Sequence, residues 1–243
     1  MATSPRASAP VLAALALVTA LAPAQAQACR VALVLALDVS TSVDAREDRL
    51  QREGLANALV APEVAEAILG GSQPVALHAF EWSGQYAQTT LLDWALIRTP
   101  EDLASAAEGI RLSTRGDGDH PTALGAALLR AALSFKDAPD CDFRKIDVSG
   151  DGANNHAFPP SSAYRALDFS GITVNGLVIG GEADTAAVVD HYRSEVLRGP
   201  GAFLEIAEGF EDYERAMRRK LVRELESRPV GGAAASGQQD EPS

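Results

Sequence analysis

The chain has 243 residues, enough for one large domain with a well-filled core, and its 47% hydrophobic and 22% charged residues are the proportions of an ordinary globular protein. Its formal net charge of −12 repels the phosphates of nucleic acids and the headgroups of anionic lipids. The composition therefore argues against a nucleic-acid-binding protein and against attachment to membranes by charge.

The N-terminal segment differs from the rest of the chain. A single basic residue, Arg6, precedes a short apolar segment, and small residues lead up to Cys29. This is the layout of a secretory signal, because the apolar segment is too short to span a bilayer as a helix. We predict a signal peptide at residues 1–28, with cleavage after Ala26 or Ala28, and a periplasmic or secreted product without stable membrane insertion. Ala26 also disfavours a lipid anchor on Cys29, because a bulky aliphatic residue is usual there.

Strand-like and helix-like segments alternate along the following 200 or so residues. The segment Val31–Leu37 is apolar on both faces, as a central parallel strand is. Two strand-like segments flank Ser83 and Gly84 in the pattern of a hairpin. The alternation predicts an α/β fold with a doubly wound, mostly parallel sheet and one antiparallel edge strand. We expect strands at 31–37, 75–82, 85–94, 172–181 and 202–207, another ending within 145–152, and helices at 42–60, 100–110, 122–135, 162–168, 184–197 and 211–226.

The last predicted helix has a recognisable apolar stripe, formed by Tyr213, Met217 and Leu221. Acidic residues come early in this helix and basic residues late, in agreement with its dipole. The basic run 218–220 is interpreted as a solvated face. Beyond it, residues 228–243 are small, polar and aperiodic, which predicts a disordered tail. Residues 29–227 are therefore expected to form a single domain.

Oxygen-bearing side chains stand where predicted strands and helices meet. Asp38, Ser40 and Ser42 alternate after the first strand, Asp151 follows a later strand, and Thr122 begins a helix. In doubly wound sheets, ligands bind beyond the carboxyl ends of the strands. Two carboxylates and three hydroxyls form an oxygen-only donor set, which favours Mg²⁺, or alternatively Mn²⁺ or Ca²⁺, over zinc or copper. The five residues predict a metal site at this edge of the sheet.

Simpler interpretations exist for each of these residues. Ser42 is suited to cap the helix that follows it, and Thr122 is suited to the same role at its own helix. Asp151 is also a common residue type in turns. Capping explains only one of the three oxygen-bearing residues after the first strand, whereas a metal site explains them all.

The order of these motifs resembles the metal-ion-dependent adhesion site of von Willebrand factor A domains: D-x-S-x-S after a first apolar strand, then T-x-x-G, then Asp-Gly. The segments "LDVSTSVD", "QREG", "FEWSG", "DVSGDGANN", "VNGL" and "GPGAF" resemble a bacterial secreted branch of that superfamily, the DUF1194 type, from Arg30 to Glu226. The chain departs from the common Gly-Gly-Thr pattern, because His120 and Pro121 precede Thr122.

The resemblance implies a Rossmann-like von Willebrand A fold and a function in adhesion or scaffolding, without catalysis. It implies that Asp38, Ser40 and Ser42 bind the metal, with Thr122 and Asp151 completing the set directly or through water. It also implies a protein partner that supplies a Glu or Asp carboxylate to the cation.

The two cysteines precede the two aspartates by similar distances along the chain, nine residues from Cys29 to Asp38 and ten from Cys141 to Asp151. If the two strands are parallel neighbours, as the fold implies, both cysteines lie at the edge of the sheet opposite the metal. We expect them to form a disulfide in an oxidising compartment.

A different function is suggested by "GDGANN", which resembles the acidic motif of haloacid-dehalogenase-like, magnesium-dependent phosphatases. In that interpretation Asp38 is the nucleophile. The chemistry requires a general acid two residues later, where this chain has Ser40, and a final Asp where it has Asn155. Lys145 is also at the wrong end of its strand. A third possibility is an interaction scaffold that binds no metal.

Other polar residues near the predicted site have weaker signals. His78 lies in an apolar strand and is interpreted as a core or face residue. His120 and His156 border the site loops without the spacing of zinc ligands. Glu81 and the pair Asn154–Asn155 suit either the rim of the site or ordinary turns.

Overall fold

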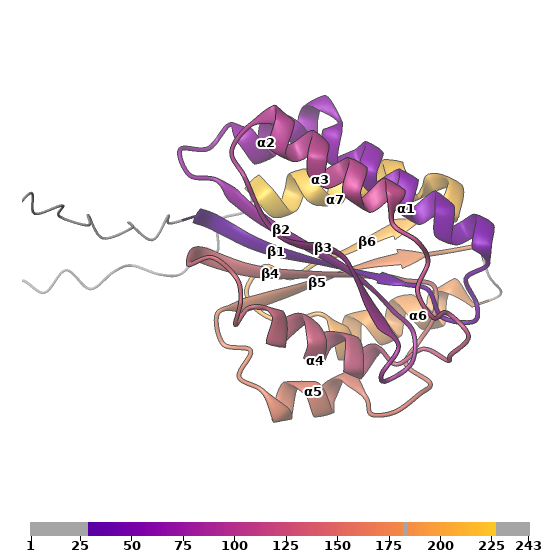
Figure 1. Ribbon diagram of the computed structural model, residues 1–243. Helices are drawn as coiled ribbons and strands as arrows, with labels where there is room; N and C mark the ends of the chain where they lie inside the picture. Colours follow the sequence, from indigo (N-terminus) through magenta and orange to yellow (C-terminus); the bar gives the residue numbers. More distant parts are fainter. Residues whose placement is uncertain (1–28, 182–183, 227–243) are drawn as a thin grey trace, which may run out of the picture.

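The computed structural model describes residues 29–181 and 184–226, which form a six-stranded sheet in the order β3-β2-β1-β4-β5-β6 (Figure 1). All neighbouring strands are parallel except β2 and β3, which are antiparallel. The predicted fold class is confirmed. The predicted signal peptide at 1–28 and tail at 228–243 lie outside the described residues. The strands are β1 (Cys29–Asp38), β2 (Val75–Trp82), β3 (Gln88–Ile97), β4 (Cys141–Gly150), β5 (Ile172–Ile179) and β6 (Leu204–Ala207).

Helices cover both faces of the sheet (Figure 1). One face packs against α1, α2, α3 and α7, and the other against α4, α5 and α6. Within the described residues, no helix is both long and apolar enough to cross a membrane. The helices are α1 (Ala45–Val60), α2 (Pro62–Leu69), α3 (Pro100–Leu112), α4 (Leu124–Ser134), α5 (Pro160–Ala166), α6 (Thr185–His191) and α7 (Tyr213–Glu226), with a π-helical turn η1 (Tyr192–Val196) and a 3₁₀ turn η2 (Phe210–Asp212).

The central strand β1 explains the double-sided core. Successive side chains of a strand point to opposite faces, so Leu33 and Leu35 enter the core beneath α1 and α7, whereas Ala32 and Val34 enter the core beside α4. All four side chains are buried. The apolar run that predicted a central strand therefore supplies both cores and directs the chain to the sheet edge at Asp38.

Four elements differ most from the expectations. Strand β3 spans Gln88–Ile97 and so begins and ends three residues later than predicted. Helix α2 was not predicted, although Pro62 at its first turn is a common helix start. The helix predicted at 184–197 ends at His191 and continues as the π-helical turn η1. The final helix begins with the short turn η2 before α7. These differences leave the predicted fold class unchanged.

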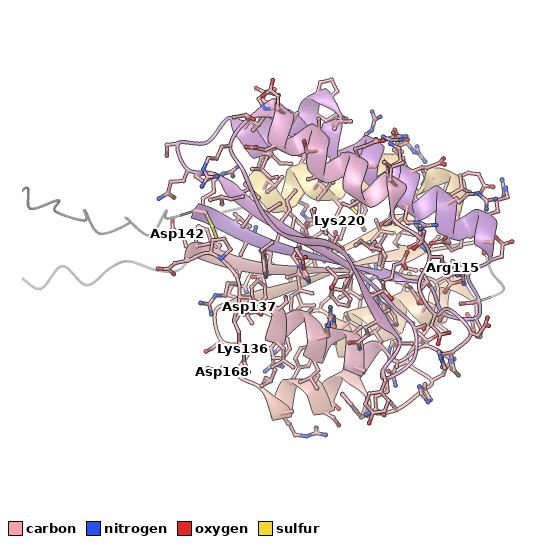
Figure 2. The ribbon with its side chains drawn as sticks, viewed as in Figure 1. Arg115, Lys136, Asp137, Asp142, Asp168 and Lys220 are labelled. Atoms are coloured by element: carbon pink, nitrogen blue, oxygen red, sulfur yellow. A yellow bond between two sulfur atoms is a disulfide. The ribbon has the colours of Figure 1, made fainter. Side chains whose placement is uncertain are left out.

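The predicted disulfide between Cys29 and Cys141 is confirmed. The two residues face each other in the register of β1 and β4, with their Cα atoms 4.4 Å apart. Figure 2 shows this bond beside Asp142, at the end of the sheet away from Arg115. The disulfide therefore fixes the amino ends of the two strands whose carboxyl ends carry Asp38 and Asp151.

The interpretation of Lys220 as part of a solvated face is wrong. Its side chain is fully buried, and its Nζ lies 2.8 Å from Asp147 Oδ1 and 2.7 Å from Glu224 Oε1 (Figure 2). Lys145 adds a second buried cation, which donates to the Glu224 carbonyl. The prediction used only the charge pattern along the helix. It could not show that β4 packs against this helix and carries the carboxylate of Asp147, which pairs with Lys220.

Candidate metal centre

Asp38 ends β1 and is fully buried. The Ser40 backbone N–H donates to Asp38 Oδ1 over 2.8 Å, and Gln51 Nε2 of α1 donates to the Asp38 carbonyl over 2.8 Å. The other carboxylate oxygen, Oδ2, is buried and makes no hydrogen bond within the described residues. The loop after β1 is therefore fixed in place while one oxygen of its first carboxylate stays without a protein donor.

The structure brings all five predicted residues together. Ser42 Oγ donates to Asp151 Oδ1 over 2.8 Å, and Ser40 Oγ lies 3.2 Å from Thr122 Oγ1 and 3.3 Å from Ser42 Oγ. Asp38 and Ser40 are fully buried, whereas Ser42 is exposed. The cluster thus extends from the buried end of β1 to the surface, where another molecule can reach it.

The capping interpretations of Ser42 and Thr122 are not what the structure shows. Helix α1 is capped by Asp44, which accepts from the backbone N–H groups of Arg46 and Glu47 in a complete capping box. Helix α4 begins at Leu124 without any side-chain cap. The hydroxyls of Ser42 and Thr122 are therefore not occupied by helix ends.

Two asparagines hold Thr122 in place. Asn155 Oδ1 accepts from the Thr122 backbone N–H over 2.9 Å, and the Asn155 backbone N–H donates back to the Thr122 carbonyl over 3.0 Å. Asn154 Oδ1 accepts from the Gly125 backbone N–H over 3.1 Å. These contacts fix the start of α4, so Thr122 reaches the cluster even though His120 and Pro121 replace the usual glycines.

Two further residues, Gly150 and Tyr192, shape the cluster. A Cβ atom on Gly150 would lie 2.8 Å from Asp38 Oδ2 and 2.8 Å from Tyr192 Oη, so only glycine fits without displacement. Tyr192, from η1, is fully buried, and its hydroxyl makes no hydrogen bond within the described residues. No motif in the sequence marks Tyr192, because it comes from a distant turn.

The electrostatics of the cluster favour a proton or a cation on Asp38. Burial, and then the charge of Asp151, raise the pKa of Asp38 from 3.8 to about 8. Arg115 opposes this shift, although its guanidinium donates to the carbonyls of Val39 and Val43. Burial and the neighbouring carboxylates also raise the pKa of Tyr192. The positive charge of Arg115 therefore does not offset the burial of the Asp38 carboxylate.

The donor chemistry fits a hard divalent cation. The cluster offers two carboxylates and three hydroxyls, and the buried Oδ2 of Asp38 has no donor in the part of the chain that the structure describes. Within the described ranges, no group of three or more His, Cys, Asp or Glu residues is arranged so that it could hold a metal ion. Oxygen donors with few carboxylates are typical of Mg²⁺, Mn²⁺ or Ca²⁺ sites.

The remaining candidates point elsewhere. Glu81 accepts from the Gly116 backbone N–H over 2.8 Å on the side away from the cluster, and burial raises its pKa to about 7. His120 Nε2 lies 2.9 Å from Asp117 Oδ2. His78 is buried in β2, as interpreted from the sequence. Lys145 is engaged with the Glu224 carbonyl, towards the other end of β4.

Comparisons with known proteins agree with this fold. A family model described as a protein of unknown function (DUF1194) matches residues 28–229. Proximal thread matrix protein 1 from the mussel byssus is 18% identical with a TM-score of 0.58, over 81% of this chain and 48% of that one. A von Willebrand factor type A protein from Catenulispora acidiphila is 16% identical with a TM-score of 0.58, over 81% and 43%. No curated protein sequence matches.

A further structure of the mussel protein is titled as having a zinc-occupied adhesion-site motif, at 13% identity and a TM-score of 0.56, over 81% of this chain and 46% of that chain. This chain spans less than half the length of each of these structures. Their likeness to it is therefore one of fold, in a module found within larger proteins.

Proposed function

The chain belongs to the DUF1194 family and has a von Willebrand factor A fold, and on this premise we propose that it binds a protein partner through a divalent cation. The observation that carries the proposal is the buried Oδ2 of Asp38, which has no donor among the described residues, beside four other oxygen-bearing side chains. Asp38, Ser40, Ser42, Thr122 and Asp151 would hold the cation. The expected cation is Mg²⁺, with Mn²⁺ or Ca²⁺ as alternatives.

The residues of the chain explain why an acidic partner suits the site. Three of the five donors are neutral hydroxyls, so the two carboxylates would balance the charge of a divalent cation without an excess of negative charge. The bound cation would supply an electrophilic position for one carboxylate of the partner. The exposed Ser42 lies at the surface end of the cluster, where a Glu or Asp side chain can approach. Asn155 and Gln51 keep the two donor loops fixed, which limits the entropy lost on binding.

The structural neighbours support a binding role. One is a byssus matrix protein, and a further neighbour, at 12% identity and a TM-score of 0.57, is a pilus adhesin from Lactobacillus rhamnosus. We also propose that the chain works in the periplasm or outside the cell, because disulfides persist in oxidising compartments and Cys29 is bonded to Cys141.

Water-proton relaxation tests the proposal. Mn²⁺ is added to the protein. An ion that binds tumbles more slowly, which increases the relaxation rate of the protons of its coordinated water. N-acetylglutamate is then titrated in, and its carboxylates are expected to displace this water and reduce the enhancement. N-acetylglutaminamide, which has no carboxylate, is the control and is expected to have no effect. Equal responses to the two compounds would contradict recruitment of an acidic group, and an absence of any enhancement would contradict the metal site.

A further inference from the structure

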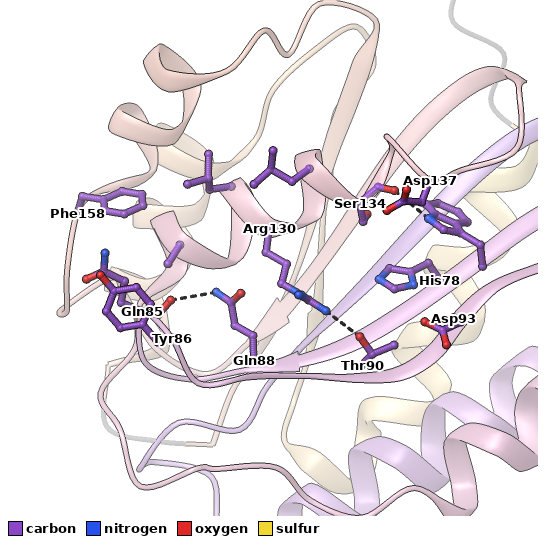
Figure 3. A pocket seen from close by; sticks show the side chains of 14 residues that line it. His78, Gln85, Tyr86, Gln88, Thr90, Asp93, Arg130, Ser134, Asp137 and Phe158 are labelled. Atoms are coloured by element: carbon purple, nitrogen blue, oxygen red, sulfur yellow. Dashed lines mark hydrogen bonds between the residues drawn. The ribbon is translucent and has the colours of Figure 1, made fainter.

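A pocket separate from the metal centre lies between helix α4 and the edge strands β2 and β3 (Figure 3). Its volume is about 450 Å³, within the range of small-molecule sites. None of the five proposed metal ligands lines it. The pocket thus needs its own explanation, which does not depend on the proposed function.

The pocket has an aromatic end, a central arginine and an acidic end. Figure 3 shows Tyr86 and Phe158 at one end, Asp93 and Asp137 at the other, and Arg130 reaching across the middle from α4. Tyr86 is 90% exposed and forms an aromatic wall at its end. A ligand lying in the pocket therefore meets an apolar end, a central cation and an acidic end.

Arg130 has unused capacity to bind an anion. One Nη donates to Thr90 Oγ1 over 2.7 Å, and the guanidinium lies 5.3 Å from the centre of the Phe80 ring. The guanidinium is in none of the ion pairs formed within the described residues, whereas Arg52, Arg111 and Arg218 each have a carboxylate partner. A guanidinium that is half-buried without a carboxylate is suited to receive one from a ligand.

The floor between Arg130 and the acidic end is rigid and uncharged. His78 is 5% exposed, and its ring stacks on Trp94 at a centroid distance of 5.2 Å. Trp94 Nε1 donates to the Ser134 carbonyl over 2.9 Å, which fixes the indole. Burial, and then the charge of Arg130, lower the pKa of His78, against smaller effects of Asp93 and the Leu92 backbone. The aromatic floor therefore leaves Arg130 as the cation of the pocket among its lining residues.

We propose that this pocket binds a free amino acid with an apolar or aromatic side chain. The carboxylate of the ligand pairs with Arg130, its ammonium group lies towards Asp93 and Asp137, and its side chain lies against Tyr86 and Phe158. A simple carboxylic acid leaves the acidic end unmatched, and a simple amine leaves the guanidinium unmatched. Only a ligand with both charges next to an apolar group meets all three parts of the pocket.

Titration calorimetry with L-phenylalanine, L-tyrosine and L-leucine tests the proposal. The wild-type chain is expected to bind at least one of them, and to bind its N-acetyl and its amide derivatives at least tenfold more weakly. Arg130→Gln is expected to weaken binding of the amino acid at least tenfold and to leave binding of the amide unchanged. The double variant Asp93→Asn, Asp137→Asn is expected to lose the preference over the N-acetyl derivative.

Three controls make the outcome decisive. Arg165→Gln changes an exposed arginine that, like Arg130, bonds a hydroxyl, and is expected to bind as the wild type does. Tyr86→Ala changes a 90% exposed residue, so weaker binding in a folded variant is expected even if Arg130→Gln fails to fold. Ser42→Ala is expected to bind the amino acid normally, which separates this site from the metal centre. Absence of binding by the wild type, or equal binding of the derivatives, overturns the proposal.

Discussion

Two buried sites in this chain, one around Asp147 and Glu224 and the other around Asp38, differ in the cations that lie beside their carboxylates. Asp147 and Glu224 share the ammonium of Lys220, and Lys145 donates to the Glu224 backbone nearby, so two acids lie among two cations. Asp38 is equally buried, but within the described residues no lysine or arginine lies within ion-pair distance of its carboxylate. The carboxylates of the first group have a cation beside them, whereas the described residues place none beside the carboxylate of Asp38.

The difference separates a structural role from a binding role. Lys220 of α7 pairs with Asp147 of β4, so the ammonium and the carboxylates of this group have partners within the folded chain. Asp38 is buried beside Asp151 and has a raised pKa, as carboxylates at functional sites often have. Burial also raises the pKa of Asp147, to about 7, although Lys220 beside it lowers that pKa. The two groups therefore differ in whether the described residues place a cation next to the carboxylate.

Removing the matched cation is expected to have the largest effect. Lys220→Met leaves Asp147 and Glu224 buried without their shared ammonium group, and breaking a buried ion pair in this way typically costs about 3–5 kcal/mol. Urea denaturation measures the loss. Arg219→Met, which removes an exposed arginine paired with Glu205, is the control and is expected to cost less than about 1 kcal/mol. Equal losses in the two variants would contradict a structural role for the buried group.

The unmatched carboxylate is expected to give a distinctive pH dependence in the metal-free protein. Between the unfolded pKa of 3.8 and the folded pKa of about 8, the folded chain holds a proton on Asp38 that the unfolded chain releases. Asp38 therefore lowers the free energy of unfolding as pH rises through this window, by at most about 1.4 kcal/mol per pH unit.

Denaturation at several pH values in the presence of a chelator measures this slope. Asp38→Asn is expected to flatten it, because the amide does not titrate, and to lose manganese binding. Saturating Mn²⁺ is expected to flatten the wild-type slope, since the cation takes the place of the proton. A slope that is the same in Asp38→Asn and in the wild type would show that Asp38 is not the group responsible.

The smallest effect is expected at Tyr192. Its buried hydroxyl makes no hydrogen bond within the described residues, and an unsatisfied buried hydroxyl costs about 1–3 kcal/mol. Tyr192→Phe removes the hydroxyl and keeps the ring in its core. We expect the metal-free variant to be as stable as the wild type or about 1 kcal/mol more stable. Destabilisation by more than 1 kcal/mol would show that this hydroxyl has a partner in solution.

The sequence was sufficient for the sheet and for most helices, because the apolar run of β1 and the hairpin around Ser83 and Gly84 are local signals. The boundary of α6 was missed, since a π-helical turn continues the same pattern of side chains. The burial of Lys220 was missed for a different reason. Its partner Asp147 lies 73 residues earlier, and helix periodicity holds no information about a distant strand.

The five oxygen-bearing residues were found because three of them stand close together in the sequence and the others follow recognisable turns. The roles of Tyr192 and of Asn155, which hydrogen-bonds the Thr122 backbone, could not be predicted from the sequence. They depend on how η1 and the loop after β4 approach the cluster. The amino-acid pocket likewise combines β2, β3 and α4, which no linear motif joins.

Manganese titration of the wild type and Ser42→Ala by calorimetry tests the metal centre most directly. Ser42 donates to Asp151 at the exposed end of the cluster and caps no helix, so its loss removes a proposed ligand while α1 keeps its own cap. Ser149→Ala, a buried serine of the same sheet outside the cluster, is the control. We expect at least tenfold weaker binding in Ser42→Ala and wild-type affinity in Ser149→Ala. Equal affinity in Ser42→Ala and the wild type, or no binding by the wild type, would contradict the proposed metal centre.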